Sequence, residues 1–170
     1  MTAQAIALNE IEWRSDAVAA SAGRAISNVA THTLAGIKHL RILNAMSVIR
    51  DALTELLRHL HTEDSITALE NATPEQRIKI ATKFCEINDK VRLMFAASEN
   101  VHLGYWKPWY TPKLNAIKLL NSELVGHSEA LKDTDAALII LSKKDQEFLL
   151  EAILNPKEPS EDLYRVFARK

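Results

Sequence analysis

Residues 16–61 read DAVAASAGRAISNVATHTLAGIKHLRILNAMSVIRDALTELLRHLH. Apolar side chains recur through this stretch at intervals of three and four, the period of an α-helix with one buried face. They are Ile26, Val29, Leu34, Ile37, Leu40, Leu43, Ile49, Leu53, Leu56, Leu57 and Leu60. Because the stretch contains no proline, it predicts one very long helix or two packed helices, with breaks at Gly23, Gly36 or within 44–47.

Glycine and proline usage supports the same fold class. The 170 residues include four glycines and five prolines, whereas an average usage of about 7% would give roughly twelve glycines. Such a chain has few residues for tight turns or for a glycine-rich phosphate loop. This scarcity predicts an all-α protein, a helical bundle followed by a C-terminal helix-Pro-helix tail, and the length is close to the ~150 residues of one typical domain.

The charge and the cysteine content limit the possible partners. Lys and Arg total 21 against 22 acidic residues, a net charge of -1, which argues against binding nucleic acid or an anionic membrane. Cys85 is the single cysteine, so no internal disulfide can form, as is usual in a reducing compartment. The N-terminal MTAQAIALNE lacks the features of a secretory signal. We expect a cytoplasmic protein without a membrane partner.

Two proline motifs predict helix starts. Thr73-Pro74-Glu75-Gln76 has the pattern of a capping box with proline at the first helical position, so we expect a helix from Pro74 to near Asn100, preceded by a polar connection over 62–72. Thr111-Pro112 predicts a second start. The side chains expected inside are Ile78, Ala81, Phe84, Cys85, Ile87, Val91, Met94 and Phe95 in the first helix, and Leu114, Ile117, Leu120, Leu124, Val125 and Leu131 in the second.

The histidines and the cysteine are the usual candidates for chemistry. His59 and His61 should diverge on a helix, whereas the Glu99/His102 and Glu123/His127 spacings align two side chains. A di-iron bundle needs two Glu-x-x-His motifs, and only Glu99-Asn-Val-His102 matches. Cys85 lies beside the apolar stripe, where a free cysteine acts as a small hydrophobe. We therefore expect no catalytic residue, cofactor or metal; the alternative is a small metal enzyme using His32, His39, Glu99, His102, Glu123 or His127.

Four aromatic residues are concentrated in the stretch YWKPWY: Tyr105, Trp106, Trp109 and Tyr110. Aromatic residues can stack nucleobases, but such sites also need a positive track, and this region offers only Lys107 and Lys113. Trp and Tyr also anchor protein interfaces. The remaining alternative is structural, with the aromatic rings packed over one end of the bundle. We keep these four residues as a possible interface.

The last residues, 137–170, read ALIILSKKDQEFLLEAILNPKEPSEDLYRVFARK. They contain a short apolar run, a helix of about three turns ending near Leu154, an Asn-Pro stop and a second, short helix that begins at Pro159-Ser160. Each piece is too short to be stable alone. The C-terminal segment, residues 134–170, is therefore expected to dock on the bundle formed by 1–133 or on another protein.

This segment resembles the toxin-binding tail of the TacA-type antitoxins. The resemblance is carried, in order, by Leu141-Ser142, Asp145, Phe148-Leu149, Ile153-Leu154-Asn155-Pro156, Glu158-Pro159, Leu163 and Phe167-Ala168-Arg169. In that family the tail wraps a GNAT-fold acetyltransferase toxin, which acetylates aminoacyl-tRNA, and blocks its active site. The family's ribbon-helix-helix DNA-binding module has no counterpart in residues 1–133, so DNA-binding autoregulation is not expected.

The sequence thus predicts a non-enzymatic, antitoxin-like interaction protein that neutralises a protein partner, which the resemblance suggests is an acetyltransferase toxin. The expected partner-binding residues are Leu141, Phe148, Leu149, Ile153, Pro156, Pro159, Leu163, Phe167 and Arg169. The alternative is a self-associating helical bundle whose tail packs on its own core.

Overall fold

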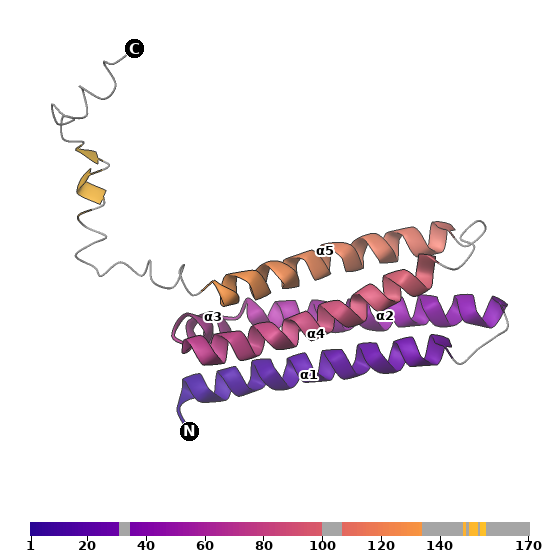
Figure 1. Cartoon of the computed structure of the whole chain (residues 1–170), viewed down its shortest axis with the longest axis horizontal. Coiled ribbons are helices and arrows are strands. Elements are labelled where there is room, and N and C mark those ends of the chain that lie inside the picture. Colours follow the sequence, from indigo (N-terminus) through magenta and orange to yellow (C-terminus); the bar gives the residue numbers. More distant parts are fainter. Residues whose placement is uncertain (31–34, 100–106, 134–147, 149, 153, 156–170) are drawn as a thin grey trace, which may run out of the picture. The chain divides into compact units, whose positions relative to one another are not determined.

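A computed structural model of the chain describes residues 1–30, 35–99, 107–133, 148, 150–152, 154 and 155. The chain divides into two compact units, 1–133 and 134–170. The described residues of the first unit form five helices (Figure 1): α1 (Ala3–Ala30), α2 (Ala35–Leu60), α3 (Glu63–Glu70), α4 (Pro74–Glu99) and α5 (Lys107–Lys132). Every element in the described ranges is helical, which confirms the all-α prediction.

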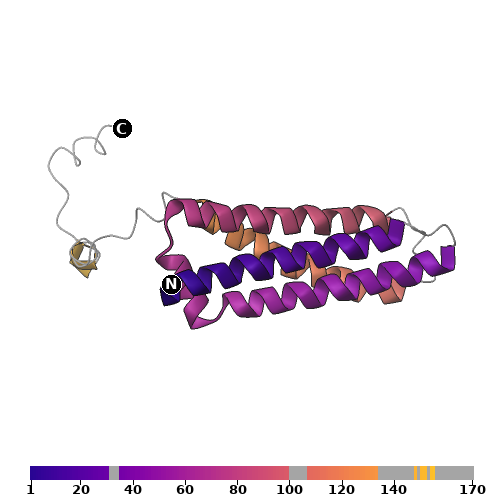
Figure 2. The ribbon, with the colours of Figure 1, turned by 90° about the horizontal axis from the view of Figure 1, so that it is seen from below.

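The four long helices form a bundle in which α1 packs against α2 and α4, and α5 also packs against α2 and α4. Figure 2 shows α1 between α2 and α4, with α5 behind it. Successive long helices run in opposite directions (Figure 1). The pairs α1/α2 and α4/α5 are therefore antiparallel, whereas the pairs α1/α4 and α2/α5 are parallel.

Helix α3 occupies the connection between α2 and α4, which lie diagonally across the bundle. Thr62 is its N-cap, with the hydroxyl accepting a hydrogen bond from Ser65 N. Ser65 and Ala68 are buried, and α3 packs mainly on α1. The prediction of a polar connection over 62–72 was wrong, because most of this stretch is the helix α3. The connection from α2 to the diagonally opposite α4 passes over the end of the core, and α3 buries two of its residues there.

The breaks between helices differ in part from the predicted ones. Residues 16–61 do form two packed helices, separated between Ala30 and Ala35, but α1 begins at Ala3. Thr2 caps that start through a hydrogen bond from Ala5 N to its hydroxyl, 3.2 Å. Gly23 and 44–47 lie inside helices. The Ala-rich beginning of the chain has a weak apolar pattern, which is why the sequence did not predict this part of α1.

Of the two helix starts predicted from Thr-Pro motifs, one is confirmed and the other is wrong. Helix α4 begins at Pro74 as predicted, and both hydrogen bonds of the capping box are present: Thr73 N to Gln76 Oε1, 2.9 Å, and Gln76 N to Thr73 Oγ1, 3.2 Å. Helix α5 begins at Lys107, so Pro112 lies inside it. The Thr111 hydroxyl donates a hydrogen bond to the Lys107 carbonyl one turn earlier, at 2.9 Å. Thr111 therefore bonds to the backbone inside the helix and does not cap its start.

The core is formed by the facing sides of the four long helices, and most predicted inward residues are buried in it. Two were assigned to the wrong face: Ile78 is 47% exposed and Leu40 is 59% exposed. Ile80 is fully buried in place of Ile78. At 3.6 residues per turn, Ile80 continues the line of Phe84, Ile87 and Val91, whereas Ile78 falls outside it.

Polar contacts link the parallel helix pairs. Between α1 and α4, Lys79 Nζ lies 2.9 Å from Glu12 Oε2 and Lys83 Nζ lies 2.6 Å from Asp16 Oδ1. Between α2 and α5, Lys113 donates to the Ser47 hydroxyl. No described helix is both long and apolar enough to cross a membrane.

Candidate functional site

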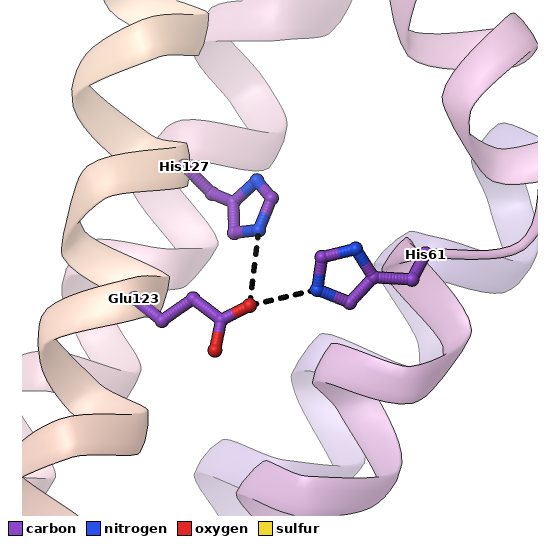
Figure 3. A group of neighbouring side chains, drawn as sticks. All are labelled: His61, Glu123 and His127. Carbon is purple, nitrogen blue, oxygen red and sulfur yellow. Dashed lines mark hydrogen bonds and ion pairs between the residues drawn. The ribbon is translucent and has the colours of Figure 1, made fainter.

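A cluster of two histidines and one glutamate lies where the end of α2 meets α5 (Figure 3). His61 directly follows the last residue of α2, and its backbone N–H donates to the carbonyls of Leu57 and Arg58, both at 3.2 Å. The next residue, Thr62, caps α3. His61 is therefore held by the backbone at the corner between two helices.

Glu123 and His127 lie one turn apart on α5, so both side chains project from the same face. His61 and Glu123 are exposed, with 59% and 45% of their side-chain surface accessible, while His127 is half-buried at 31%. The cluster is thus anchored on the bundle and open to solvent.

The distances within the cluster are short. Glu123 Oε1 lies 2.7 Å from His61 Nε2 and 4.0 Å from His127 Nε2. The two imidazole rings meet edge to face, with centroids 5.7 Å apart and an interplanar angle of 66°. One potential ligand atom from each residue falls within 4.8 Å of the other two. Imidazole nitrogen and carboxylate oxygen are common ligands of divalent metal ions.

Burial is the main reason why the pKa of His127 is lower than usual. The Glu123 carboxylate opposes this shift, and His61 adds to it. A lower pKa keeps the imidazole neutral near pH 7, with a lone pair on one nitrogen.

A second polar group surrounds Cys85, between α4 and α5. Cys85 Sγ lies 3.3 Å from Ser128 Oγ and 3.0 Å from Lys132 Nζ. Hydrogen bonds from Ser128 and Lys132 lower the pKa of the thiol, against the opposing effect of desolvation. The apolar stripe predicted a hydrophobe at this position, but the structure places the thiol beside an ammonium group and a hydroxyl.

The aromatic candidates separate on α5. Trp109 is 61% exposed, while Tyr110 is fully buried, with its hydroxyl 2.8 Å from His39 Nδ1 and 3.3 Å from the His39 carbonyl oxygen. Tyr110 therefore belongs to the core, and its assignment to an interface is corrected. Tyr105 and Trp106 lie outside the described residues.

Of the predicted partner-binding residues, only Phe148 is described, and its side chain is 70% exposed. The backbone is helical at Phe148, 150–152 and Leu154, and Asn155 N donates to the Glu151 carbonyl at 2.8 Å. The described part of the segment is thus helical up to Leu154, as predicted. Leu141, Leu149, Ile153, Pro156, Pro159, Leu163, Phe167 and Arg169 lie outside the described residues.

The histidine candidates are distributed over different places. His39 is buried beside Tyr110, and His32, His102 and the Glu99 side chain lie outside the described part of the chain. The predicted Glu123/His127 alignment is present. The third member of the cluster, His61, was missed because a contact between α2 and α5 depends on tertiary packing, which local spacing does not report.

No known protein-family profile matches this chain, and no curated protein or solved structure is significantly similar to it.

Proposed function

We propose that this protein is a non-catalytic interaction protein that binds and neutralises a partner protein through its C-terminal segment. The bundle, residues 1–133, contains the core and supplies a stable body. The single observation that carries the proposal is the exposure of large apolar side chains in the helical part of the segment.

Those side chains point in more than one direction. Phe148, Leu150 and Leu154 are 70%, 59% and 69% exposed. At 100° per residue, Leu150 and Leu154 share one face of a helix, whereas Phe148 lies on nearly the opposite face. A helix that is apolar on several faces is stable in water only when it is covered on several sides. A partner protein that surrounds this helix would cover its apolar faces. A partner that the whole segment wraps around would cover them as well.

The sequence suggests the class of partner. The resemblance to TacA-type tails makes a GNAT-fold acetyltransferase toxin the partner that we propose. In this proposal Phe148 and the other predicted anchors occupy apolar pockets of the acetyltransferase, while Pro156 and Pro159 set the path of the chain between them. Arg169 pairs with acidic groups or enters an anionic cofactor pocket.

The test is co-expression with acetyltransferases encoded next to this protein. The full chain should rescue growth and co-purify with the enzyme, and a chain truncated after Asp135 should do neither. Substitution of the exposed apolar residues, Phe148→Ser with Leu154→Ser, should weaken binding at least about tenfold, because buried aromatic anchors contribute most of an interface's affinity.

A matched control is Trp13→Ser, which removes a 67% exposed aromatic residue from the bundle. It should leave neutralisation unchanged if the segment is the binding element. If the chain truncated after Asp135 still bound and neutralised the enzyme, the proposal would be wrong.

A further inference from the structure

The cluster formed by His61, Glu123 and His127 plays no part in the proposed partner binding. Its three side chains come from two separate places in the chain, the residue after α2 and the C-terminal half of α5, and converge on one point (Figure 3). We propose that these three residues bind a divalent transition-metal ion of the zinc type.

The donor set matches that class of ion. Two imidazole nitrogens and one carboxylate oxygen are typical ligands of Zn²⁺, Ni²⁺, Cu²⁺ and Fe²⁺, whereas Ca²⁺ and Mg²⁺ prefer all-oxygen sites. The carboxylate also supplies the negative charge that a dication requires. His61 adjoins the C-terminal end of α2, where the partial negative charge of the helix favours a cation.

The present geometry needs little adjustment to hold an ion. Ligand bonds of roughly 2.0–2.2 Å place the donor atoms of a tetrahedral site about 3.3–3.6 Å apart. The distances from Glu123 Oε1 to the two imidazole nitrogens, 2.7 and 4.0 Å, lie on either side of that range. Because His61 and Glu123 are exposed, both side chains can rotate without disturbing the core.

Three protein ligands leave the fourth position of a tetrahedral ion for water or for an external group. The exposure of His61 and Glu123 gives that position access to solvent. The site would also bridge α2 and α5, so metal binding should stabilise the bundle by mass action.

Isothermal titration of the full-length, tag-free protein with Zn²⁺ tests the proposal. One Zn²⁺ should bind per chain. His61→Ala, Glu123→Gln and His127→Ala should each weaken binding by at least about 100-fold, since loss of a direct ligand should exceed the 10- to 100-fold effect of losing an outer-shell partner. Circular dichroism should show that these variants stay helical, because the side chains of His61 and Glu123 are exposed and that of His127 is only half-buried.

Thermal unfolding gives a second readout. Zn²⁺ at about 100 times its dissociation constant should raise the Tm of the wild type by roughly 5 to 10 °C. The same addition should leave the Tm of the three variants nearly unchanged. This measurement distinguishes a site on the folded bundle from weak binding to scattered histidines.

Three control variants test other possible ligands. Glu129→Gln makes the same charge change at an exposed position of α5, Cys85→Ser removes the thiol, and His59→Gln removes the histidine nearest to His61 in sequence. All three should bind Zn²⁺ like the wild type. The proposal fails if no stoichiometric binding occurs, if any one of the three ligand variants retains full affinity, or if a control variant abolishes binding.

Discussion

Tyr110 has the largest fully buried side chain among the described residues, and it carries a polar hydroxyl into the core. A buried hydroxyl is costly unless it is hydrogen-bonded, and here the ring nitrogen and the carbonyl of His39 lie within reach. The pair thus fixes the relative position of α2 and α5 near one end of the bundle. In the sequence, Tyr110 belongs to an aromatic cluster that was compatible with an interface as well as with packing over one end of the bundle.

Tyr110→Phe should therefore lower the free energy of unfolding by about 1 kcal/mol at pH 7, the typical net value of one hydrogen bond. Urea titration followed by circular dichroism measures this change. A variant as stable as the wild type would show that the contact between Tyr110 and His39 contributes nothing to the fold.

The same residue should make stability depend on alkaline pH. Burial raises the pKa of Tyr110 to about 12 in the folded protein, whereas an unfolded tyrosine has a pKa near 10. The neutral phenol is favoured in the fold, so its contribution is complete below about pH 10 and is lost as the pH rises toward 12. The loss amounts to roughly 3 kcal/mol. Urea titrations of wild type and Tyr110→Phe between pH 9 and 12 should show a steeper decline for the wild type; parallel curves would contradict the assignment.

Cys85 should be more reactive than an ordinary thiol. Ser128 and Lys132 lower its pKa, so a larger fraction is thiolate near neutral pH, and the thiolate is the nucleophile. Lys132→Met should slow alkylation by iodoacetamide several-fold at pH 7.5. Lys107→Met, at an exposed position far along the same helix, is the control and should leave the rate unchanged. Equal rates for wild type and Lys132→Met would show that the ammonium group does not affect the thiol.

At the scale of a single helix, two isoleucines of α4 allow a comparison of its buried and exposed faces. Ile80 is fully buried and Ile78 is 47% exposed. Ile80→Ala should cost about 3 kcal/mol through lost burial and a cavity, whereas Ile78→Ala should cost less than about 1 kcal/mol. Because the two substitutions are chemically identical, denaturant unfolding of the pair isolates the effect of position. A larger loss for Ile78→Ala would mean that the helix faces the core differently.

The start of α4 depends on the capping box. Thr73→Ala removes the acceptor of the Gln76 N–H and should cost about 1 kcal/mol. Thr73→Ser keeps the hydroxyl and should remain within a few tenths of a kcal/mol of the wild type. Comparing the two urea midpoints checks the cap, and equal losses for both variants would indicate an effect of the threonine methyl group instead.

How well the sequence predicted each helix depended on how local the determining interactions were. The start at Pro74 was predictable because Thr73 and Gln76 are close neighbours. The start of α5 was not, because Thr111-Pro112 shares only the Thr-Pro pair with the first motif, has Leu114 in place of the capping glutamine, and lies inside a helix. Helix α3 was also missed: Thr62, Glu63 and Asp64 supply a local start signal, but the helix has only eight residues and buries only Ser65 and Ala68. The local pattern around His61 likewise contained no sign of the α2/α5 pairing.

At the scale of the whole molecule, the buried apolar side chains among the described residues all lie within residues 1–133. A chain that ends at Asp133 should therefore keep a cooperative thermal transition within about 4 °C of the full chain, a change of no more than about 1 to 2 kcal/mol. Differential scanning calorimetry measures both transitions. A much lower Tm for the truncated chain would instead support a segment that packs on its own bundle.

The direction of the helices has a mechanical consequence. Because successive long helices alternate in direction, α1 begins and α5 ends at the same end of the bundle (Figure 1). A force applied between the N-terminus and residue 133 would separate the helices turn by turn from that end instead of sliding them past each other. Unzipping breaks few contacts at a time, so it should require less force than shearing. A partner that pulls on residue 133 would thus load the last turn of α5 first, next to the contact between Lys132 and Cys85.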